Sequence, residues 1–453
     1  MKKQIYSYQE LAQHLVHQAN NSQDIYLTDC KFLFDIKMSE LALLSTLLAD
    51  KIIHRAINIR NCQFKKIEIN DTTFEKSITI VSSSFQEIYV YSSIFHQEIR
   101  IVDSNSTCLF LRYCEFHNNV SLEYNPKQIT HIVDIDDCVF DKSVEFSNLL
   151  MSEAGEDITY NRPSSFEIYG EDTIIKHNLI IRDSLFIGST LDIRCDIGKE
   201  FQLYSINDVD NESIKIKGYI GTLRLHASRI ASLNIIQCNF ATIDIANSTI
   251  QDIIESKLQC VRMTNDAALI FRDNAIQHSN PILENEYTAK LYDNLLREKT
   301  STLFSSWIDS IKKRKSYIWG NKKTLYNYLE PIILFFPSML SGERFLLWLN
   351  KYSNDFNRSW TCGIIFTLLS TLVFYFTINY LGTSPQYFVI DFKFQNFDKV
   401  LEGYLSLLDI FNISNVAQPM HLTIWGKILL FIAKILIAYG SWQTIYAFYK
   451  FKR

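Results

Sequence analysis

At 453 residues the chain is too long for one compact core, so several domains are expected. The 45 basic and 49 acidic side chains leave a formal charge of only −4, which excludes a chain-wide attraction to nucleic acid or lipid and leaves that role to local patches. With 13 glycines and 7 prolines, the composition favours long regular elements over disorder.

The N-terminus and the cysteines indicate a reducing compartment. The first residues contain no apolar run of signal-peptide length, so we expect the N-terminus to stay on the synthesis side of the membrane. The nine cysteines form no CxxC pair and no zinc-like spacing with histidine. Five of them stand two residues before a large apolar residue: Cys30, Cys62, Cys114, Cys138 and Cys238. We interpret these as core residues rather than disulfide or metal sites.

Large apolar residues recur every five positions in three stretches, at residues 59–74, 80–95 and 220–250. Smaller residues such as Cys62 and Thr72 stand two positions before many of them. Five residues turn an α-helix by about 500°, which would scatter this set around the helix. Strands with a corner every few residues accommodate the period, because each side of the coil then carries one large and one smaller inward residue.

This pattern resembles the pentapeptide-repeat family, with slips near residues 79 and 100. The resemblance implies a mainly β N-terminal region, a right-handed quadrilateral β-helix over residues 22–280 with roughly ten coils. The pattern is largely lost between residues 140 and 179, where we expect an inserted flap or irregular coils. A capping box at residues 7–10 predicts a helix within residues 1–21 that caps the first coil, and a second helix is expected near residues 39–49. Whether the β-helix binds a partner or only supports the rest stays open.

Residues 281–358 are predicted to form a helical connector, which begins with a charged helix from residue 284 to about 313. A basic cluster belongs to this connector: Lys312, Lys313, Arg314, Lys315, Lys322 and Lys323. It is interpreted either as a juxtamembrane patch on anionic lipid, worth about 1 kcal/mol per charge, or as a collar for the phosphates of a nucleotide or oligonucleotide, with nearby aromatic residues for stacking. An apolar run at 331–337 and a helix at 344–358 are expected at the bilayer surface.

Two apolar stretches in residues 359–453 are long enough to cross a bilayer, at about 360–381 and 424–448. Basic residues flank the outer ends of both stretches, whereas the loop between them carries a net charge of −2. The positive-inside rule therefore predicts a multi-pass protein with both termini in the cytoplasm. The loop also contains residues 400–409, which could form a short amphipathic helix.

Helix, loop with a short helix, and helix is the layout of a tetrameric channel pore module, although the potassium-channel filter motif is absent. In the second stretch Lys427, Lys434 and Ser441 recur every seven residues and share one helix face. A lysine this deep is costly against lipid, so it is expected to face protein or water. We predict that this face lines a pore in a homo-oligomer, with a tetramer favoured; the alternative is that Lys427 snorkels and Lys434 packs against a partner, such as a loop carboxylate.

The segments at 350–360 and 437–445 are similar to those of bacterial proteins that join degenerate pentapeptide repeats to two C-terminal spans. Within that group the chain resembles the membrane effectors of Hailong anti-phage systems. The resemblance implies a channel-like oligomer of the bacterial inner membrane that single-stranded DNA oligomers from a partner nucleotidyltransferase hold silent. It matches no ligand-binding motif residue by residue.

The sequence contains no G-x-S-x-G, P-loop, H-E-x-x-H or Rossmann glycine pattern, so we expect no enzyme, no cofactor and no metal or catalytic site. The favoured function is a ligand-gated, channel-like membrane effector in anti-phage defence. The alternative is a membrane-tethered β-helix scaffold that binds a protein partner, with the spans as an anchor. An acidic loop and a lysine-bearing helix face favour the first function, because an anchor needs neither.

Overall fold

The computed structural model describes residues 3–5, 9–11, 13, 24–32, 35–37, 52–152, 164–209, 213–256, 258–298, 342–356, 359–382, 397–409 and 422–451. The chain divides into two compact units, Met1–Ile270 and Phe271–Arg453. Three predicted features lie outside the described residues: the helix near 39–49, the basic cluster at 312–323 and the apolar run at 331–337.

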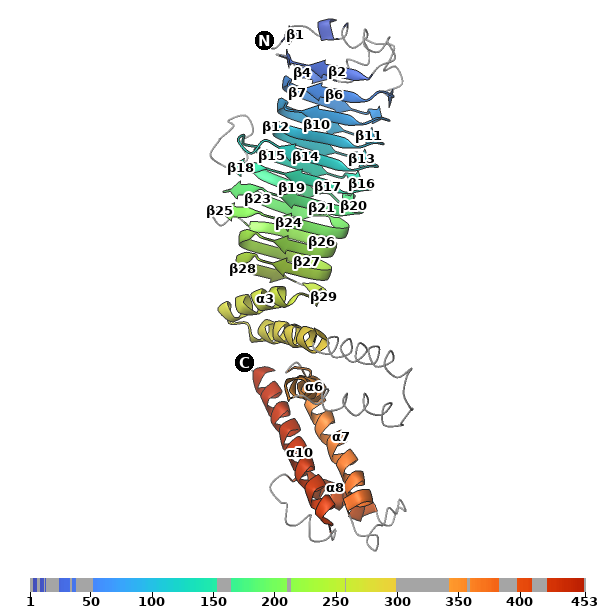
Figure 1. Ribbon diagram of the computed structural model, residues 1–453, viewed down its shortest axis with the longest axis vertical. Coiled ribbons are helices and arrows are strands. Elements are labelled where there is room, and N and C mark those ends of the chain that lie inside the picture. Colours follow the sequence, from blue (N-terminus) through green and yellow to red (C-terminus); the bar gives the residue numbers. More distant parts are fainter. Residues whose placement is uncertain are drawn as a thin grey trace, which may run out of the picture. The chain divides into compact units, whose positions relative to one another are not determined.

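The first unit is a parallel β-solenoid of about nine turns, whose strands stack from β2 to β29 (Figure 1). Its strands are β1 Lys3–Ile5, β2 Ile25–Thr28, β3 Cys30–Phe32, β4 Asp35–Lys37, β5 Ile52–Ile53, β6 Ile57–Arg60, β7 Gln63–Asn70, β8 Thr73–Phe74, β9 Ile78–Val81, β10 Ser84–Tyr91, β11 Ile94–Phe95, β12 Ile99–Arg112, β13 Glu115–Phe116, β14 Val120–Tyr124, β15 Ile132–Asp136, β16 Val139–Phe140, β17 Val144–Ser147, β18 Leu150–Ser152, β19 Ser165–Tyr169, β20 Ile174–Ile175, β21 Asn178–Arg182, β22 Leu185–Ile187, β23 Thr190–Arg194, β24 Asp196–Tyr204, β25 Asn207–Val209, β26 Ser213–His226, β27 Arg229–Ala246, β28 Thr249–Ser256 and β29 Gln259–Met263. The β-solenoid predicted from the five-residue period is therefore confirmed.

One coil shows why the five-residue period produces this fold. Alternate side chains of a strand point to opposite faces, so each side of the coil turns two residues inward. In the coil that begins at β6 the inward pairs are Ile57 and Ile59, Cys62 and Phe64, Ile67 and Ile69, and Thr72 and Phe74, all buried except the half-buried Ile69. The large member of each pair fills the core, and its position recurs in the next coil. Phe64 and Phe85 are paired neighbours whose rings stack with centroids 4.9 Å apart.

The smaller inward residues serve the backbone as well as the core. The hydroxyl of Ser83 accepts a hydrogen bond from the backbone N–H of Cys62 in the preceding coil, at 3.1 Å, and donates to the carbonyl of Val81 at 2.9 Å. The backbone N–H of Ser83 in turn donates to the hydroxyl of Ser104 at 3.0 Å. Small polar residues recur at this position because their side chains satisfy backbone groups that the corners leave without a strand partner.

The corners demand a left-handed backbone, which explains why Asp and Asn recur there. At one corner the residues with positive φ are Asp29, Asn61, Ser82, Asp103, Asn148, Asp183, Ser205, Ala227 and Asn247. Asp and Asn adopt this conformation more readily than other residues with a side chain. Ala227 also has a positive φ, of 50°, although alanine lacks the short polar side chain that makes this conformation accessible to Asp and Asn.

The solenoid continues through residues 140–179, where the sequence pattern is largely lost. Phe140 pairs with Ile175 and Val144 pairs with Leu179, so the ladder keeps its register over a coil of 35 residues. Ordinary coils such as the one from Phe64 to Phe85 advance by 21 residues. The additional length lies between β18 and β19, and residues 153–163 of that connection are not among the residues that the structure describes.

The two ends of the solenoid differ from the sequence prediction. Residues 3–5 form β1, which pairs with β3 and precedes the helix predicted from the capping box at residues 7–10; residues 9–11 are helical and Leu11 is buried. The strands end at Met263, and α3 (Asn265–Gln277) follows inside the range predicted as β-helix. The alternating pattern stops there, and the buried residues Ala267, Ala268, Phe271 and Ala275 recur at helical spacing instead.

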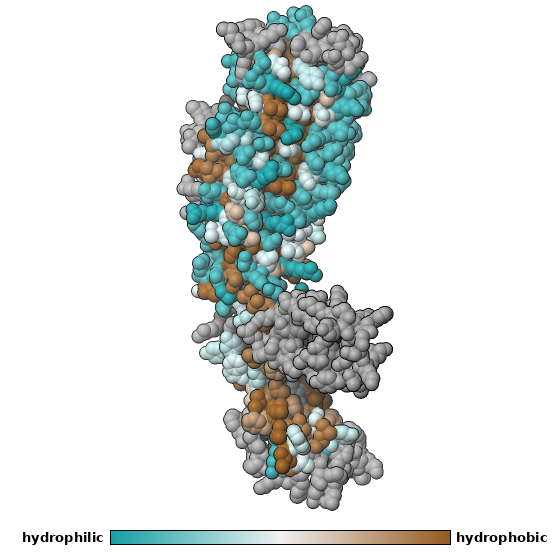
Figure 2. Space-filling view, viewed as in Figure 1, coloured by the Kyte–Doolittle hydropathy of each residue, from teal (hydrophilic) through white to brown (hydrophobic). Residues whose placement is uncertain are grey.

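The second unit is helical. It contains a helix at residues 281–298, α6 (Gly342–Asn354), α7 (Trp360–Thr377), the π-helical turn η3 (Ile378–Gly382), α8 (Phe397–Leu408) and α10 (Ile424–Phe451). Two of its segments, Trp360–Leu381 and Ile424–Tyr449, are long and apolar enough to cross a membrane. Figure 2 shows hydrophobic residues gathered over these helices.

The helices α7 and α10 approach each other closely through small residues. A Cβ atom added at Gly440 would lie 2.5 Å from the Oγ1 of Thr367, and one added at Gly363 would lie 2.4 Å from the Oγ1 of Thr444. The two threonine hydroxyls donate to carbonyls of their own helices, Thr367 to Gly363 at 2.8 Å and Thr444 to Gly440 at 2.9 Å. Small residues with internally satisfied hydroxyls allow such close packing between two helices.

Candidate functional site

The three residues of the predicted polar face occupy different environments. Lys434 is buried with 4% of its surface exposed, Lys427 is exposed, and Ser441 is half-buried. They lie on one face of α10, and it is Lys434 whose side chain hydrogen-bonds the end of α8. The structure therefore brings Lys434 together with α8 and leaves Lys427 outside this contact.

The ammonium group of Lys434 binds the C-terminal end of α8. Its Nζ donates to the carbonyl oxygens of Ser406 at 3.2 Å and of Leu407 at 2.9 Å, and also to the carbonyl of Asp409. The Asp409 carboxylate is close enough to attract the ammonium electrostatically. These contacts match the packing alternative for Lys434, with backbone carbonyls as the hydrogen-bond partners.

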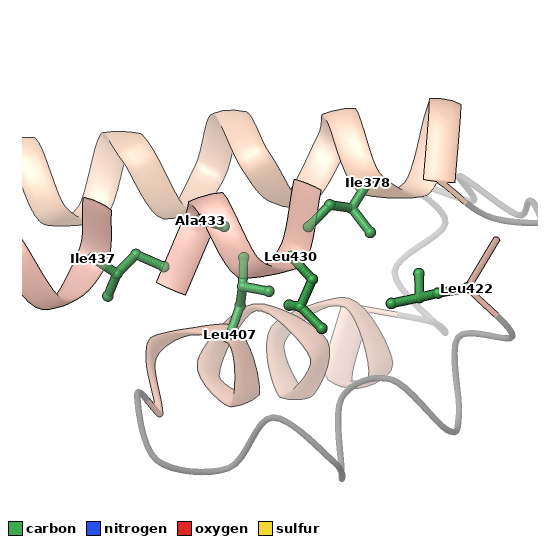
Figure 3. Close-up of a cluster of buried hydrophobic side chains, with 6 residues drawn as sticks. All are labelled: Ile378, Leu407, Leu422, Leu430, Ala433 and Ile437. Atoms are coloured by element: carbon green, nitrogen blue, oxygen red, sulfur yellow. The ribbon is translucent and has the colours of Figure 1, made fainter. Parts of the chain in front are cut away.

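An apolar cluster holds α8 against α10 and η3. The buried residues of this cluster are Ile378, Leu407, Leu422, Leu430, Ala433 and Ile437. Figure 3 shows Leu407 pointing from α8 toward Leu430 and Ala433 of α10. On the other side, the Tyr404 hydroxyl of α8 donates to the carbonyl of Leu368 in α7 at 2.9 Å. α8 is thus fixed to both long helices.

The contacts of α8 lie far from the ends of the long helices. Lys434 stands ten residues after Ile424, the first residue of α10, which places it about 15 Å along the helix. Leu368 lies in the first half of the segment Trp360–Leu381, so the Tyr404 hydroxyl reaches past the middle of that segment from the α8 end. α8 therefore extends along the helix pair instead of crossing its end.

The chemistry at the end of α8 is electrostatic. The last carbonyls of an α-helix have no partner within the helix and carry a partial negative charge. In an apolar environment an unsatisfied carbonyl is costly, and so is an isolated ammonium. The contact between Lys434 and α8 satisfies both groups.

The loop helix was predictable, but the ligands of Lys434 were not. α8 confirms the amphipathic helix predicted for residues 400–409 and begins slightly earlier, at Phe397. The acceptors are backbone carbonyls, which carry no residue signature; the available signal was the C-terminus of a short helix predicted within the same region, 359–453, as Lys434.

The solenoid carries candidate features of other kinds. The Arg112 guanidinium contacts the buried Asp134 carboxylate at 2.9 Å on its outer face. A cavity of about 280 Å³ lies inside the first coils and is lined almost entirely by apolar side chains. Within the described ranges, no group of His, Cys, Asp or Glu side chains is arranged to hold a metal ion. The basic cluster at 312–323 lies outside these ranges, so its binding role stays a prediction.

No family model matches this chain, and the searches of curated proteins and of solved structures found no match either.

Proposed function

We propose that the chain is a membrane protein in which α7 and α10 span the bilayer, α8 re-enters it from the loop side, and several copies form an ion-conducting pore. The observation that carries this proposal is the attachment of α8 deep between the helices by Lys434 and Tyr404. A plain two-helix anchor needs no helix at that depth. Backbone that is not part of a spanning helix is tolerated at membrane depth where protein or water satisfies it.

The surfaces of the long helices support insertion and assembly. Large apolar side chains cover their outward faces, including Ile365, Leu369 and Val373 of α7 and Phe431 and Ile435 of α10, each more than half exposed. A soluble protein rarely exposes apolar surface on this scale. Lipid and neighbouring copies of the chain are the partners that would cover it.

The flanking charges support an orientation with both termini in the cytoplasm. Arg344, Lys351 and Arg358 precede the first span, Lys450, Lys452 and Arg453 follow the second, and the loop between is net acidic. The solenoid would then be cytoplasmic. A cysteine at position 395 in a cysteine-free background should label with an impermeant maleimide in intact cells, whereas one at position 200 should label only after lysis. Labelling at position 200 alone would refute this orientation.

Gating by a cytoplasmic ligand is the part of the proposal that rests on sequence alone. The basic cluster at 312–323 supports a polyanionic ligand, and the resemblance to the Hailong effectors supports a single-stranded DNA oligomer. Changing Lys312, Lys313, Arg314 and Lys315 to glutamine should then weaken oligonucleotide binding and reduce its salt dependence. Unchanged affinity with an unchanged salt slope would assign the cluster to lipid headgroups.

Pore formation is tested in planar bilayers with the purified oligomer. Tyr404→Phe removes the hydrogen bond that fixes α8 to α7, so we expect it to change the unitary conductance or the open probability. Tyr352→Phe is a matched control, because Tyr352 is an exposed residue of α6. If the intact oligomer passes no current above background, the pore proposal is wrong and the scaffold with a membrane anchor takes its place.

A further inference from the structure

Three backbone carbonyls at the end of α8 converge on one nitrogen atom. They belong to Ser406, Leu407 and Asp409, and the nitrogen is the Nζ of Lys434. An ammonium group has three N–H donors, so these three acceptors use its full donor capacity. The arrangement surrounds a single positive charge with oxygen ligands.

The Lys434 ammonium lies in largely apolar surroundings. Lys434 is buried, and its helix neighbours Leu430 and Ile437 belong to the apolar cluster against Leu407. Of the three residues that supply the carbonyls, Leu407 is buried, Ser406 is half-buried and Asp409 is exposed. The carbonyl oxygens therefore replace the hydration shell of the ammonium, as filter carbonyls replace that of potassium.

We propose that the carbonyl cradle of Ser406, Leu407 and Asp409 is a binding site for a monovalent alkali cation, which the Lys434 ammonium occupies as a tethered ion. An ammonium and a potassium ion are similar in size and carry the same charge. The partial negative charge of the helix C-terminus, about half a unit, and the Asp409 carboxylate both attract a positive charge to this position.

The inference rests on the proposed function for its meaning, because a cation site at the end of a re-entrant helix is where a pore would bind its permeant ion. The tethered ammonium would then exclude that ion from the site. Movement of α10 relative to α8 would withdraw the ammonium and free the carbonyls for an ion from solution.

The test compares thermal unfolding of the full-length oligomer in detergent, in chloride salts of K⁺, Na⁺, Li⁺ and N-methylglucamine at one ionic strength. Lys434→Met keeps an unbranched side chain and removes the charge; Lys427→Met does the same at the exposed lysine of α10. We expect the Lys434→Met variant to have a reduced Tm in N-methylglucamine that rises saturably by several degrees with K⁺. The Tm of the wild type and that of Lys427→Met should each be the same in K⁺ as in N-methylglucamine.

A Tm of Lys434→Met that is the same in all four salts would overturn the proposal. If this variant fails to assemble, Lys434→Gln replaces it, since its amide can donate to the cradle without supplying charge. Assembly of the variants only in K⁺ or Na⁺ supports the site, whereas assembly of Lys434→Arg alone, in every salt, overturns it. Cation-dependent stability without any current would keep the cation site and reject the pore; current without cation-dependent stability would do the reverse.

Discussion

The close contact between α7 and α10 makes a quantitative prediction for a single methyl group. In the Gly440→Ala variant the new Cβ would lie 2.5 Å from the Oγ1 of Thr367 and 3.0 Å from a ring carbon of Phe366. Both are side-chain atoms. The contact is therefore too tight by about 1 Å, but the obstructing atoms can be removed by mutation.

Two opposing terms determine the size of the effect. Overpacking of a tight contact costs about 1–3 kcal/mol, whereas replacing glycine by alanine within a helix gains about 1 kcal/mol. We expect Gly440→Ala to lower the free energy of unfolding by about 1 kcal/mol. In the double variant with Thr367→Ala the clash is relieved, so the two changes should show a coupling energy of about 1–2 kcal/mol.

Gly363 provides the contrasting case. A Cβ there would meet the backbone N and Cα atoms of Thr444 at 3.1 Å in addition to its hydroxyl. Truncating Thr444 to alanine leaves those backbone atoms in place, so it should rescue Gly363→Ala only in part. Reversible unfolding of the detergent-solubilised protein, followed by far-UV circular dichroism during titration with sodium dodecyl sulfate, measures all of these variants. Stabilisation by Gly440→Ala that does not depend on Thr367 would show that the helices do not meet at this contact.

Three further predictions concern the solenoid. Replacing Ala227 by asparagine should raise the free energy of unfolding by about 0.5–1 kcal/mol, because its φ of 50° favours asparagine, and thermal unfolding measures the gain. Hydrogen bonds from His117 and Lys176 hold the pKa of Asp141 below its ordinary value of 3.8. The stability that these bonds contribute is therefore complete above that value and is lost as the pH falls through the lower pKa of the folded state. Asp141→Asn removes this titration, so the Tm of the variant should vary less with pH below about 5. Burial raises the pKa of the Cys195 thiol to about 12, so at pH 8 maleimide should label it at least about a hundredfold more slowly in the folded protein than in the unfolded chain.

The sequence predicted the solenoid well because its period is a local property. Each inward pair repeats the same packing, so the five-residue step is visible wherever coils advance by 20 or 21 residues. The step is lost around residues 140–179 because one coil is longer and moves the pattern out of phase. The ladder of backbone hydrogen bonds tolerates such an excursion, which a periodicity search does not.

The candidate site was predictable only in its parts. The depth of Lys434 and the helical character of residues 400–409 follow from the sequence. Which of the two alternatives for Lys434 applies depends on where α8 packs, and that is a tertiary property set by Leu407, Leu430 and Ile378. The seven-residue spacing of Lys427, Lys434 and Ser441 predicted one shared environment, yet Lys434 is buried against α8 whereas Lys427 is exposed.

The in-register stacking of the coils has a consequence for how such a chain changes in length during evolution. Gln63 pairs with Ser84 and Tyr91 pairs with Asn70, so deletion of residues 63–83 would join Cys62 to Ser84 and leave every ladder neighbour of an equivalent kind. A gene can therefore lose or duplicate one coil without disturbing the coils on either side. Each such event changes the height of the solenoid by one strand spacing, about 4.8 Å. Coils elsewhere in the solenoid advance by 20 or 22 residues, so the corners accommodate a difference of one residue. Selection would still favour whole coils as the unit of change, because the inward pairs of both neighbouring coils then keep their register.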